Sequence, residues 1–544
     1  MASQKRGADM LAESIRRAGA TRIFTLSGNH IMSVFDAALD AGIELVHVRH
    51  EAAAVHMADA WARLTGTPGI AMVTAGSGHG NAVSALYTAQ MSESPVILLS
   101  GSAPVSKAGW GTFQEIDQPA MAAPVSKASW ASASADALAG DFARAWSLAA
   151  SGRRGPVHLS LPTDALEGPV AKQELPPKEA YAPQSQPLAR DGLAADILAR
   201  LRQARRPLVV AGPAGLTDAG RQAMRDLQAA TGLPVVATES PRGSKDPSLG
   251  AFAQVLSQAD CVLLLGKRLD FTLGHGKAPV IADDCRFLQI DADSSELDRS
   301  RRAVGDRLEW AELAEPLAAA GQLTRAGGAQ GGYGAWCDEV RAAVDYRPPE
   351  WQSAGQAAGK GIHPAALFRP VQELLDSHPD SVLISDGGEC GQWAQACLRA
   401  GHRVVNGVAG AIGSALPMAL GARCAYPDAP IVAVMGDGTF GFHCAEIDTG
   451  VRYGLPFVCL VANDARWNAE YQIQLNAYGK DRLIGCELLP TRYEKVAQGF
   501  GAQGACVDDL AALPAALKQA AAERRVPFCL NVALEGLPAP LVRR

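Results

Sequence analysis

Short apolar runs rich in Val, Ile and Leu alternate with longer amphipathic stretches along most of the chain. Strands buried on both faces form continuous apolar runs, and strands that alternate with helices form parallel sheets. Many of these runs end in Gly, Ser, Asp or Asn, at the edge where such sheets bind ligands. The pattern predicts buried strands within 22–28, 43–49, 69–76, 95–101, 207–213, 233–239, 261–268, 287–293, 381–388, 431–438, 457–464 and 528–534.

Two polar stretches separate these runs into three blocks. Residues 167–193 hold five prolines, and residues 324–363 are rich in Gly, Pro and Gln around a short amphipathic helix. Both patterns are typical of surface connections. We therefore expect an α/β protein with three doubly wound parallel-sheet domains, at 1–170, 190–325 and 360–544. The first and third blocks are loosely similar in layout.

Composition narrows the class of protein. The 544 residues carry a formal charge of −6, which argues against a nucleic-acid partner, and 48% are apolar, which excludes disorder for most of the chain. No apolar run approaches the roughly 18 residues of a membrane helix, and the first residues lack a signal-peptide pattern. The eleven cysteines are scattered without a C-x-x-C. We expect no membrane association and a cytoplasmic location.

The most specific chemical pattern lies in the third block. Gly436-Asp437-Gly438 follows one predicted strand, and Asn463-Asp464 follows the next. A strand-end glycine lets the backbone approach a phosphate, the following helix N-terminus attracts it, and paired oxygen ligands hold a hard cation. A tight turn with an Asp N-cap is the alternative interpretation.

These motifs resemble those of the thiamine diphosphate-dependent enzymes, in the group of acetolactate synthase, benzaldehyde lyase and 2-hydroxyacyl-CoA lyase. The resemblance covers nearly the whole chain and implies pyrimidine-binding, central Rossmann-like and diphosphate-binding domains, in that order. It implies that Asp437 and Asp464 bind Mg²⁺ by side chain and Arg466 by its main-chain oxygen. The family usually has Asn at position 464. The cofactor contacts implied in this motif are Gly436, Gly438 and Thr439.

Glu51 follows the predicted strand 43–49 and begins an Ala-rich stretch. In the family, the Glu at this place touches N1′ of the aminopyrimidine, promoting the imino tautomer that removes the C2 proton. A carboxyl in apolar surroundings can share such a proton. A first-turn Glu favoured by the helix dipole is the alternative. The glycine-rich loop 74–81 resembles the family's loop near the pyrimidine, and Asn81 is its implied cofactor contact.

Three further residues are candidates on the substrate side. Gln114, in a loop that resembles the family's F-Q-E-x-D, would hydrogen-bond an oxygen of the substrate or an intermediate. His30 resembles the active-site His of benzaldehyde lyases and would shuttle a proton. Glu470, on the predicted helix after the metal motif, would act as acid or base. The alternatives are an exposed loop Gln, a capping or core His and a solvated helix Glu.

Two segments of the third block complete the implied cofactor site. Ile412, in a stretch with Gly410, stands where the family has the bulky residue under the cofactor. The strand end at 386–393 is used for the diphosphate, with Gly388, Glu389 and Cys390 as the implied contacts. Gly391-Gln392 replaces a bulky pair of the benzaldehyde lyases, which suggests a roomier or more polar substrate site.

The resemblance implies a ThDP- and Mg²⁺-dependent carbon–carbon lyase or carboligase. It would act on 2-hydroxy carbonyl or 2-hydroxyacyl(-CoA) compounds through a C2 ylide and an enamine. Alternatives are acetolactate synthase-like condensation of 2-oxo acids and a non-catalytic ThDP- or nucleotide-binding subunit, which would be expected to lack Glu51. A homodimer or homotetramer with active sites between subunits is implied. The central domain could hold FAD, the ADP part of CoA or nothing, and it lacks the G-x-G-x-x-G that NAD would need.

Overall fold

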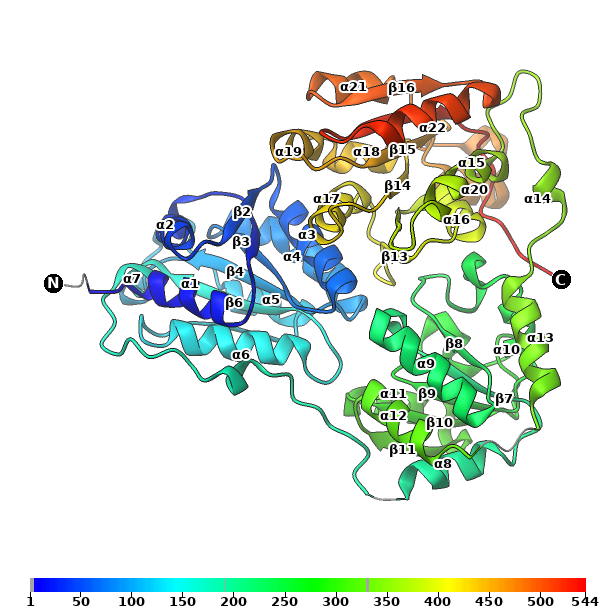
Figure 1. Cartoon of the computed structure of the whole chain (residues 1–544), viewed down its shortest axis with the longest axis horizontal. Coiled ribbons are helices and arrows are strands. Elements are labelled where there is room, and N and C mark those ends of the chain that lie inside the picture. Colours follow the sequence, from blue (N-terminus) through cyan, green and yellow to red (C-terminus); the bar gives the residue numbers. More distant parts are fainter. Residues whose placement is uncertain (1–3, 191, 329–331) are drawn as a thin grey trace. The chain divides into compact units, whose positions relative to one another are not determined.

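The computed structural model describes residues 4–190, 192–328 and 332–544. It contains three parallel β-sheets, each covered by helices, and every strand pairing is parallel (Figure 1). A strand overlaps each of the twelve ranges predicted from the apolar runs, and only β4 and β10 extend one residue beyond theirs. The predicted fold class, three α/β domains with parallel sheets, is therefore confirmed. The first and third sheets belong to one compact unit, and the central sheet belongs to another.

The first sheet has the strand order β2-β1-β3-β4-β6-β5. Its strands are β1 (Arg22–Thr25), β2 (Glu44–His47), β3 (Gly69–Val73), β4 (Val96–Ser102), β5 (Ala128–Ala131) and β6 (Val157–Pro162). Its helices are α1 (Gly7–Arg17), α2 (Met32–Asp40), α3 (Glu51–Thr65), α4 (Ser77–Met91), α5 (Gln118–Ala122), α6 (Leu138–Ala150) and α7 (Thr163–Glu167).

The central sheet has the order β11-β10-β9-β7-β8. Its strands are β7 (Pro207–Ala211), β8 (Val235–Ala237), β9 (Cys261–Leu265), β10 (Arg286–Asp291) and β11 (Leu308–Leu313). Its unit includes α8 (Leu193–Leu201), α9 (Asp218–Thr231), α10 (Phe252–Leu256), α11 (Ser294–Val304), α12 (Pro316–Ala326), α13 (Gly334–Asp345) and α14 (Glu350–Ser353).

The third sheet has the order β13-β12-β14-β15-β17-β16. Its strands are β12 (Val382–Ser385), β13 (His402–Val405), β14 (Ile431–Gly436), β15 (Val458–Asn463), β16 (Gln503–Val507) and β17 (Phe528–Ala533). Its helices are α15 (Pro364–Asp376), α16 (Gly388–Cys397), α17 (Ala415–Ala425), α18 (Asp437–His443), α19 (Glu446–Arg452), α20 (Asn468–Tyr478), α21 (Tyr493–Gly499) and α22 (Leu513–Ala522). Numbered from its own first strand, this sheet has the same order as the first sheet, which confirms their similar layout.

The apolar runs did not predict five of the described strands. Four of these lie at a sheet edge: β5, β11, β13 and β16. An edge strand packs against one neighbour only, so it tolerates polar and half-exposed residues. The fifth, β6, lies inside the first sheet but carries His158 and Ser160 among its apolar residues. These polar side chains interrupt the continuous run that a buried strand usually shows.

Helices α3 and α17 pack closely and join the first and third domains within their unit. The contact is made by small residues: Ala52, Ala53 and Ala54 are buried in one continuous core with α17. A Cβ on Gly421 would lie only 2.5 Å from the Met57 carbonyl oxygen, so this position requires glycine. The close approach fixes the axis of α3, whose first residue is Glu51. Within the described residues, no helix has the length and apolarity to cross a membrane.

Candidate functional site

The ends of β14 and β15 border a cavity of about 70 Å³ in the third domain. Gly436 ends β14, and Asp437 begins α18 directly after it, so the first turn of that helix faces the cavity. The lining residues are Gly387, Gly388, Glu389, Cys390, Ile412, Gly436, Asp437, Gly438, Thr439, Ala462, Asp464, Arg466, Trp467, Asn468, Ala469 and Glu470.

Two carboxylates in this cavity are disfavoured as anions. Burial raises the pKa of Asp437 to about 6. Burial, and then the charge of Asp437, raise the pKa of Asp464 to about 7. Oδ2 of Asp437 is buried and has no hydrogen-bond partner. Two adjacent carboxylates, each disfavoured as an anion, fit a hard divalent cation, which would stabilise both charges.

The rest of the coordination must come from other oxygens. Among the described residues, no three His, Cys, Asp or Glu side chains are grouped so that they could hold a metal ion. Backbone carbonyls and a diphosphate are the oxygen ligands that such a two-carboxylate site still needs. Asn463 shapes the turn here: its Oδ1 accepts from the amide of Ala465 at 3.2 Å, and Ala465 has φ 54°. Arg466, the predicted main-chain ligand, follows this turn.

Two glycines beside the carboxylates let the walls of the cavity pack closely. A Cβ on Gly438 would lie 2.6 Å from the Trp467 ring, and a Cβ on Gly387 would lie 2.6 Å from Cγ2 of Ile412. The backbone at the start of α18 lines the cavity, and the free amides of a helix start attract a phosphate. Ile412 is one of the residues that line the cavity. Gly410 lies in the same loop with φ 69° but is not among the lining residues.

The charges of the lining are mostly negative. Glu389 and Glu470 add two carboxylates to those of Asp437 and Asp464, and Arg466 is the one basic residue among those that line the cavity. The Arg466 guanidinium lies 4.2 Å from the centre of the Tyr471 ring. Glu470 is exposed at the start of α20, so its carboxylate is open to solvent in a single chain.

A second group of predicted residues lies at the carboxyl edge of the first sheet. Glu51 begins α3 with a relative exposure of 9%, and Nδ2 of Asn81 donates to its Oε2 at 3.0 Å. A Cβ on Gly78 would come within 3.2 Å of the other Glu51 oxygen. His50 caps the helix by accepting from the amide of Ala52. The structure thus brings Glu51 and Asn81 together and leaves a side-chain-free face beside them.

His30 and Gln114 lie at the same edge. His30 Nδ1 is 3.3 Å from Thr74 Oγ1, and its ring stacks on Phe113 with centroids 6.1 Å apart. Burial lowers the pKa of His30, so the ring is neutral near pH 7. Gln114 has φ 59°, and a Cβ on Gly76 would lie 2.8 Å from the Gln114 Cβ. The two loops therefore meet at this point.

Gln118 is a buried residue of this region that the sequence did not single out. Its Oε1 accepts from the amide of Gly76 at 3.0 Å, and its Nε2 donates to the Gly101 carbonyl and the Ser160 hydroxyl. These bonds tie the Gln114 loop to the glycine-rich loop and to β4 and β6. A Gln next to a helix start carries no pattern that distinguishes this role from a surface position.

The described residues that line the cavity at β14 and β15 do not include the group from the first domain. All sixteen residues that line the cavity come from the third domain, and Glu51, Asn81, His30 and Gln114 come from the first. Each group is built at the carboxyl ends of its own sheet.

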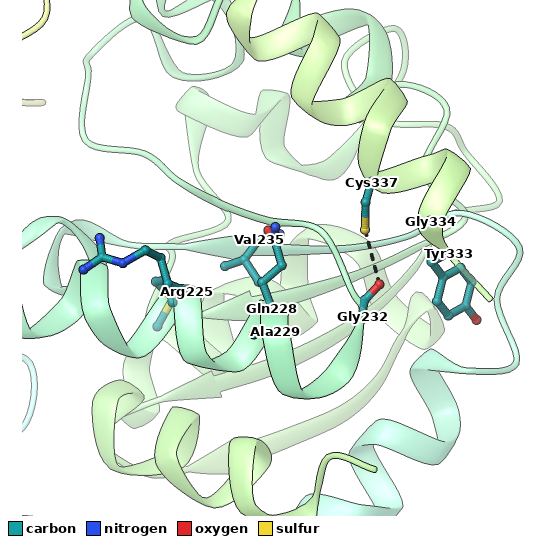
Figure 2. Close-up of a pocket in the computed structure, with 9 residues that line it drawn as sticks. Arg225, Gln228, Ala229, Gly232, Val235, Tyr333, Gly334 and Cys337 are labelled. Carbon is teal, nitrogen blue, oxygen red and sulfur yellow. Dashed lines mark hydrogen bonds between the residues drawn. The ribbon is translucent and has the colours of Figure 1, made fainter. Parts of the chain in front are cut away.

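The central domain offers different features. At its strand ends, Lys267 Nζ donates to Thr272 Oγ1 at 2.8 Å, and Arg268 pairs with the buried Glu296 at 3.3 Å. Figure 2 shows a separate pocket of about 430 Å³, beside the end of α9 and the start of α13. There the Cys337 thiol donates to the Gly232 carbonyl at 3.2 Å, and the Arg225 side chain extends away from Cys337 (Figure 2). Burial raises the pKa of Cys337, so the thiol stays protonated and is a poor nucleophile.

Comparison with known proteins matches three parts of the chain. Residues 5–121 match the thiamine pyrophosphate enzyme N-terminal TPP binding domain, 194–309 the central domain and 386–532 the C-terminal TPP binding domain. A probable acetolactate synthase of Mycobacterium bovis is 30% identical, over 96% of this chain and 94% of that protein. The 2-hydroxyacyl-CoA lyase 2 of Homo sapiens is 30% identical, over 92% and 85%. The acetolactate synthase large subunit of Parasynechococcus marenigrum is 28% identical, over 92% and 83%.

Proposed function

Because the chain belongs to the thiamine diphosphate-dependent enzymes, we propose that it is a Mg²⁺-dependent carbon–carbon lyase or carboligase for 2-hydroxy carbonyl or 2-hydroxyacyl(-CoA) compounds. Relatives with the names of 2-hydroxyacyl-CoA lyases and of acetolactate synthases are about equally similar to it. The observation that carries the choice between them is the negative lining of the cavity at β14 and β15.

Asp437 and Asp464 would hold the magnesium ion, together with the main-chain oxygen of Arg466. The unpaired Oδ2 of Asp437 and the raised pKa values of both carboxyls support this assignment. The amides around Gly438 and Gly388 would hold the diphosphate, and Ile412 would support the rings. Thiamine diphosphate, when bound, supplies a nucleophilic carbon and an electron sink.

Glu51 would exchange a proton with N1′ of the aminopyrimidine. Its burial and its hydrogen bond from Asn81 support this role, because both hold the carboxylate in one place. His30, neutral at pH 7, would accept the hydroxyl proton of a 2-hydroxy substrate, and Gln114 would bind its oxygen. The presence of Glu51 together with both candidate metal ligands favours an enzyme over a non-catalytic binding subunit.

The charge of the cavity favours the lyase over the 2-oxo acid synthase. The magnesium ion would offset the charges of Asp437 and Asp464, which leaves Glu389, Glu470 and the bound diphosphate against the single guanidinium of Arg466. A 2-oxo acid would bring its own carboxylate next to the reacting carbon, where Coulomb repulsion weakens its binding. An aldehyde or a thioester of a 2-hydroxy acid is uncharged at the corresponding position.

The separation of the two residue groups supports a homodimer or homotetramer. A first domain from one subunit would bring its Glu51 and Gln114 to the third-domain cavity of another. The eleven cysteines are odd in number and scattered without a C-x-x-C, which supports a reducing compartment, and we propose the cytoplasm.

Glu51→Gln tests the proposed chemistry. The amide keeps the shape and the bond from Asn81 but cannot exchange the proton, so we expect turnover to fall by about a hundredfold or more. Binding of ThDP and Mg²⁺, measured by calorimetry, should change by less than about threefold, because the cation and diphosphate contacts are untouched. Glu44→Gln, on the exposed side of β2, is the matched control. If Glu51→Gln keeps the turnover of the parent, the assignment of Glu51 is wrong.

A further inference from the structure

Strand β2 lies at the edge of the first sheet and leads directly to Glu51. Its even-numbered residues bond to the inner neighbour: the amides of Glu44 and Val48 donate to Thr21 and Thr25 at 2.9 Å. The backbone groups of its odd-numbered residues therefore point away from β1. An edge of this kind leaves backbone donors and acceptors without a strand partner.

Side chains from the third domain bind this open edge. The Tyr453 hydroxyl, directly after α19, accepts from the His47 amide at 2.8 Å and lies 3.1 Å from the Leu45 carbonyl, to which it donates. Nη2 of Arg452 donates to the His47 carbonyl at 2.7 Å. These contacts take the place of a neighbouring strand along β2.

Glu446 binds the backbone between the end of β2 and the start of α3. Its Oε1 accepts from the amide of Arg49 at 2.9 Å and from the amide of His50 at 3.0 Å, and the Thr449 hydroxyl donates to its Oε2 at 2.6 Å. Glu446 is fully buried. Its carboxylate thus fixes the two peptide groups directly before Glu51.

We propose that Glu446, Arg452 and Tyr453 form a side-chain clamp on β2 that positions Glu51 for proton exchange with the cofactor. The three residues satisfy four outward backbone groups from Leu45 to Arg49 and also the amide of His50, which is more than a packing contact requires. They are positioning residues, because none of them lines the cavity. The proposal rests on the proposed function of Glu51.

The rate at which the bound cofactor exchanges its C2 proton with D₂O tests the clamp, because it reports proton exchange without substrate. A displacement of about 1 Å costs about a hundredfold in rate, so Glu446→Ala should slow this exchange by about that factor. Glu446→Gln keeps the Oε1 that serves both amides and should stay within about threefold of the parent. Tyr453→Phe, which removes one hydroxyl, should slow it by about tenfold.

Two further measurements distinguish a loss of positioning of Glu51 from a loss of stability of the whole fold. In the apoprotein, deuterium uptake by the amides of Arg49 and His50 should be faster in Glu446→Ala than in the parent, while uptake at α4 is unchanged. Tyr426→Phe is the matched control for Tyr453→Phe. Tyr426 makes the same kind of bond, donating to the Leu64 carbonyl near the other end of α3 at 3.3 Å, and its loss should leave C2 exchange unchanged.

The clamp is wrong if Glu446→Ala exchanges the C2 proton within about twofold of the parent, or if Tyr426→Phe is slowed as much as Tyr453→Phe. If Glu446→Ala does not fold, the comparison of C2 exchange in Tyr453→Phe and Tyr426→Phe tests the clamp by the same criterion. A parent protein that does not accelerate C2 exchange over the free cofactor would instead contradict the proposed function. Faster amide uptake in Glu446→Ala would then still show that the clamp holds β2.

Discussion

His79 and His158 form a buried pair of neutral rings in the first domain. Their centroids are 4.5 Å apart, and their Nδ1 atoms are bonded to the hydroxyls of Ser100 and Ser129. Burial lowers the pKa of His79 to about 4 and that of His158 well below its usual value. The folded chain therefore binds fewer protons here than the unfolded chain below pH 6.5.

This proton deficit predicts acid-induced loss of stability. A lowered histidine pKa has no effect on stability above pH 6.5, and it destabilises the fold progressively as the pH drops from 6.5 towards 4, because only the unfolded chain takes up the proton. The shift of His79 corresponds to about 3 kcal/mol over the whole window. The thermal midpoint should fall more steeply from pH 7.5 to pH 5 in the parent than in His79→Gln, whose amide can still bond to Ser100. Equal slopes in the two proteins would contradict the account.

Residue types at strand ends could be predicted from the sequence, and long-range contacts could not. Glu51, Asp437 and Asp464 each follow an apolar run at the place where parallel sheets bind ligands, so their positions follow from local pattern. Gln118 bonds to a residue 42 positions away, and Glu446 to one 397 positions away. In the sequence, Glu446 is an acid in the first turn of a helix, which the helix dipole alone would explain.

In the proposed site the first turn of α18 approaches the diphosphate, which makes Gly438 an informative position. A methyl group there would meet the Trp467 ring at 2.6 Å and displace the wall of the cavity. We expect Gly438→Ala to weaken ThDP binding by about tenfold or more, measured by calorimetry in Mg²⁺. Gly441→Ala, three residues on in the same helix and with nothing within 4 Å of its Cβ, should bind like the parent. Equal affinities for the two variants would show that α18 does not face the diphosphate.

Helices and buried strands could be predicted because their periodicity is local. The apolar runs predicted every interior strand except β6, whose His158 is paired with His79 in a contact that the chain makes only when folded. The edge strands β5, β11, β13 and β16 are half-covered and carry no such run. The negative lining of the cavity also depends on folding, since Glu389 and Glu470 come from different helices.

The division of the site between two domains predicts complementation between defective chains. Glu51→Gln lacks the proton-exchanging residue and Asp437→Ala lacks a metal ligand, so each protein alone should be inactive. Hybrids of the two, co-expressed with different tags and purified through both, should regain about a quarter to a half of the parent activity. This is because some of their sites combine two intact halves from different subunits. If each site is formed within one chain, every site in the hybrid carries a defect and no activity returns.

The release of aldehyde from a 2-hydroxyacyl-CoA by the purified protein tests the central claim most directly. The cofactor-free protein should be mixed with ThDP, Mg²⁺ and the thioester, and compared with parallel reactions on pyruvate and with reactions that lack ThDP or Mg²⁺. We predict aldehyde formation that requires both ThDP and Mg²⁺. Its rate should exceed the turnover of pyruvate by at least about tenfold, because the negative lining of the cavity disfavours the carboxylate of a 2-oxo acid. Condensation of pyruvate at the higher rate, or aldehyde release without ThDP, would contradict the account.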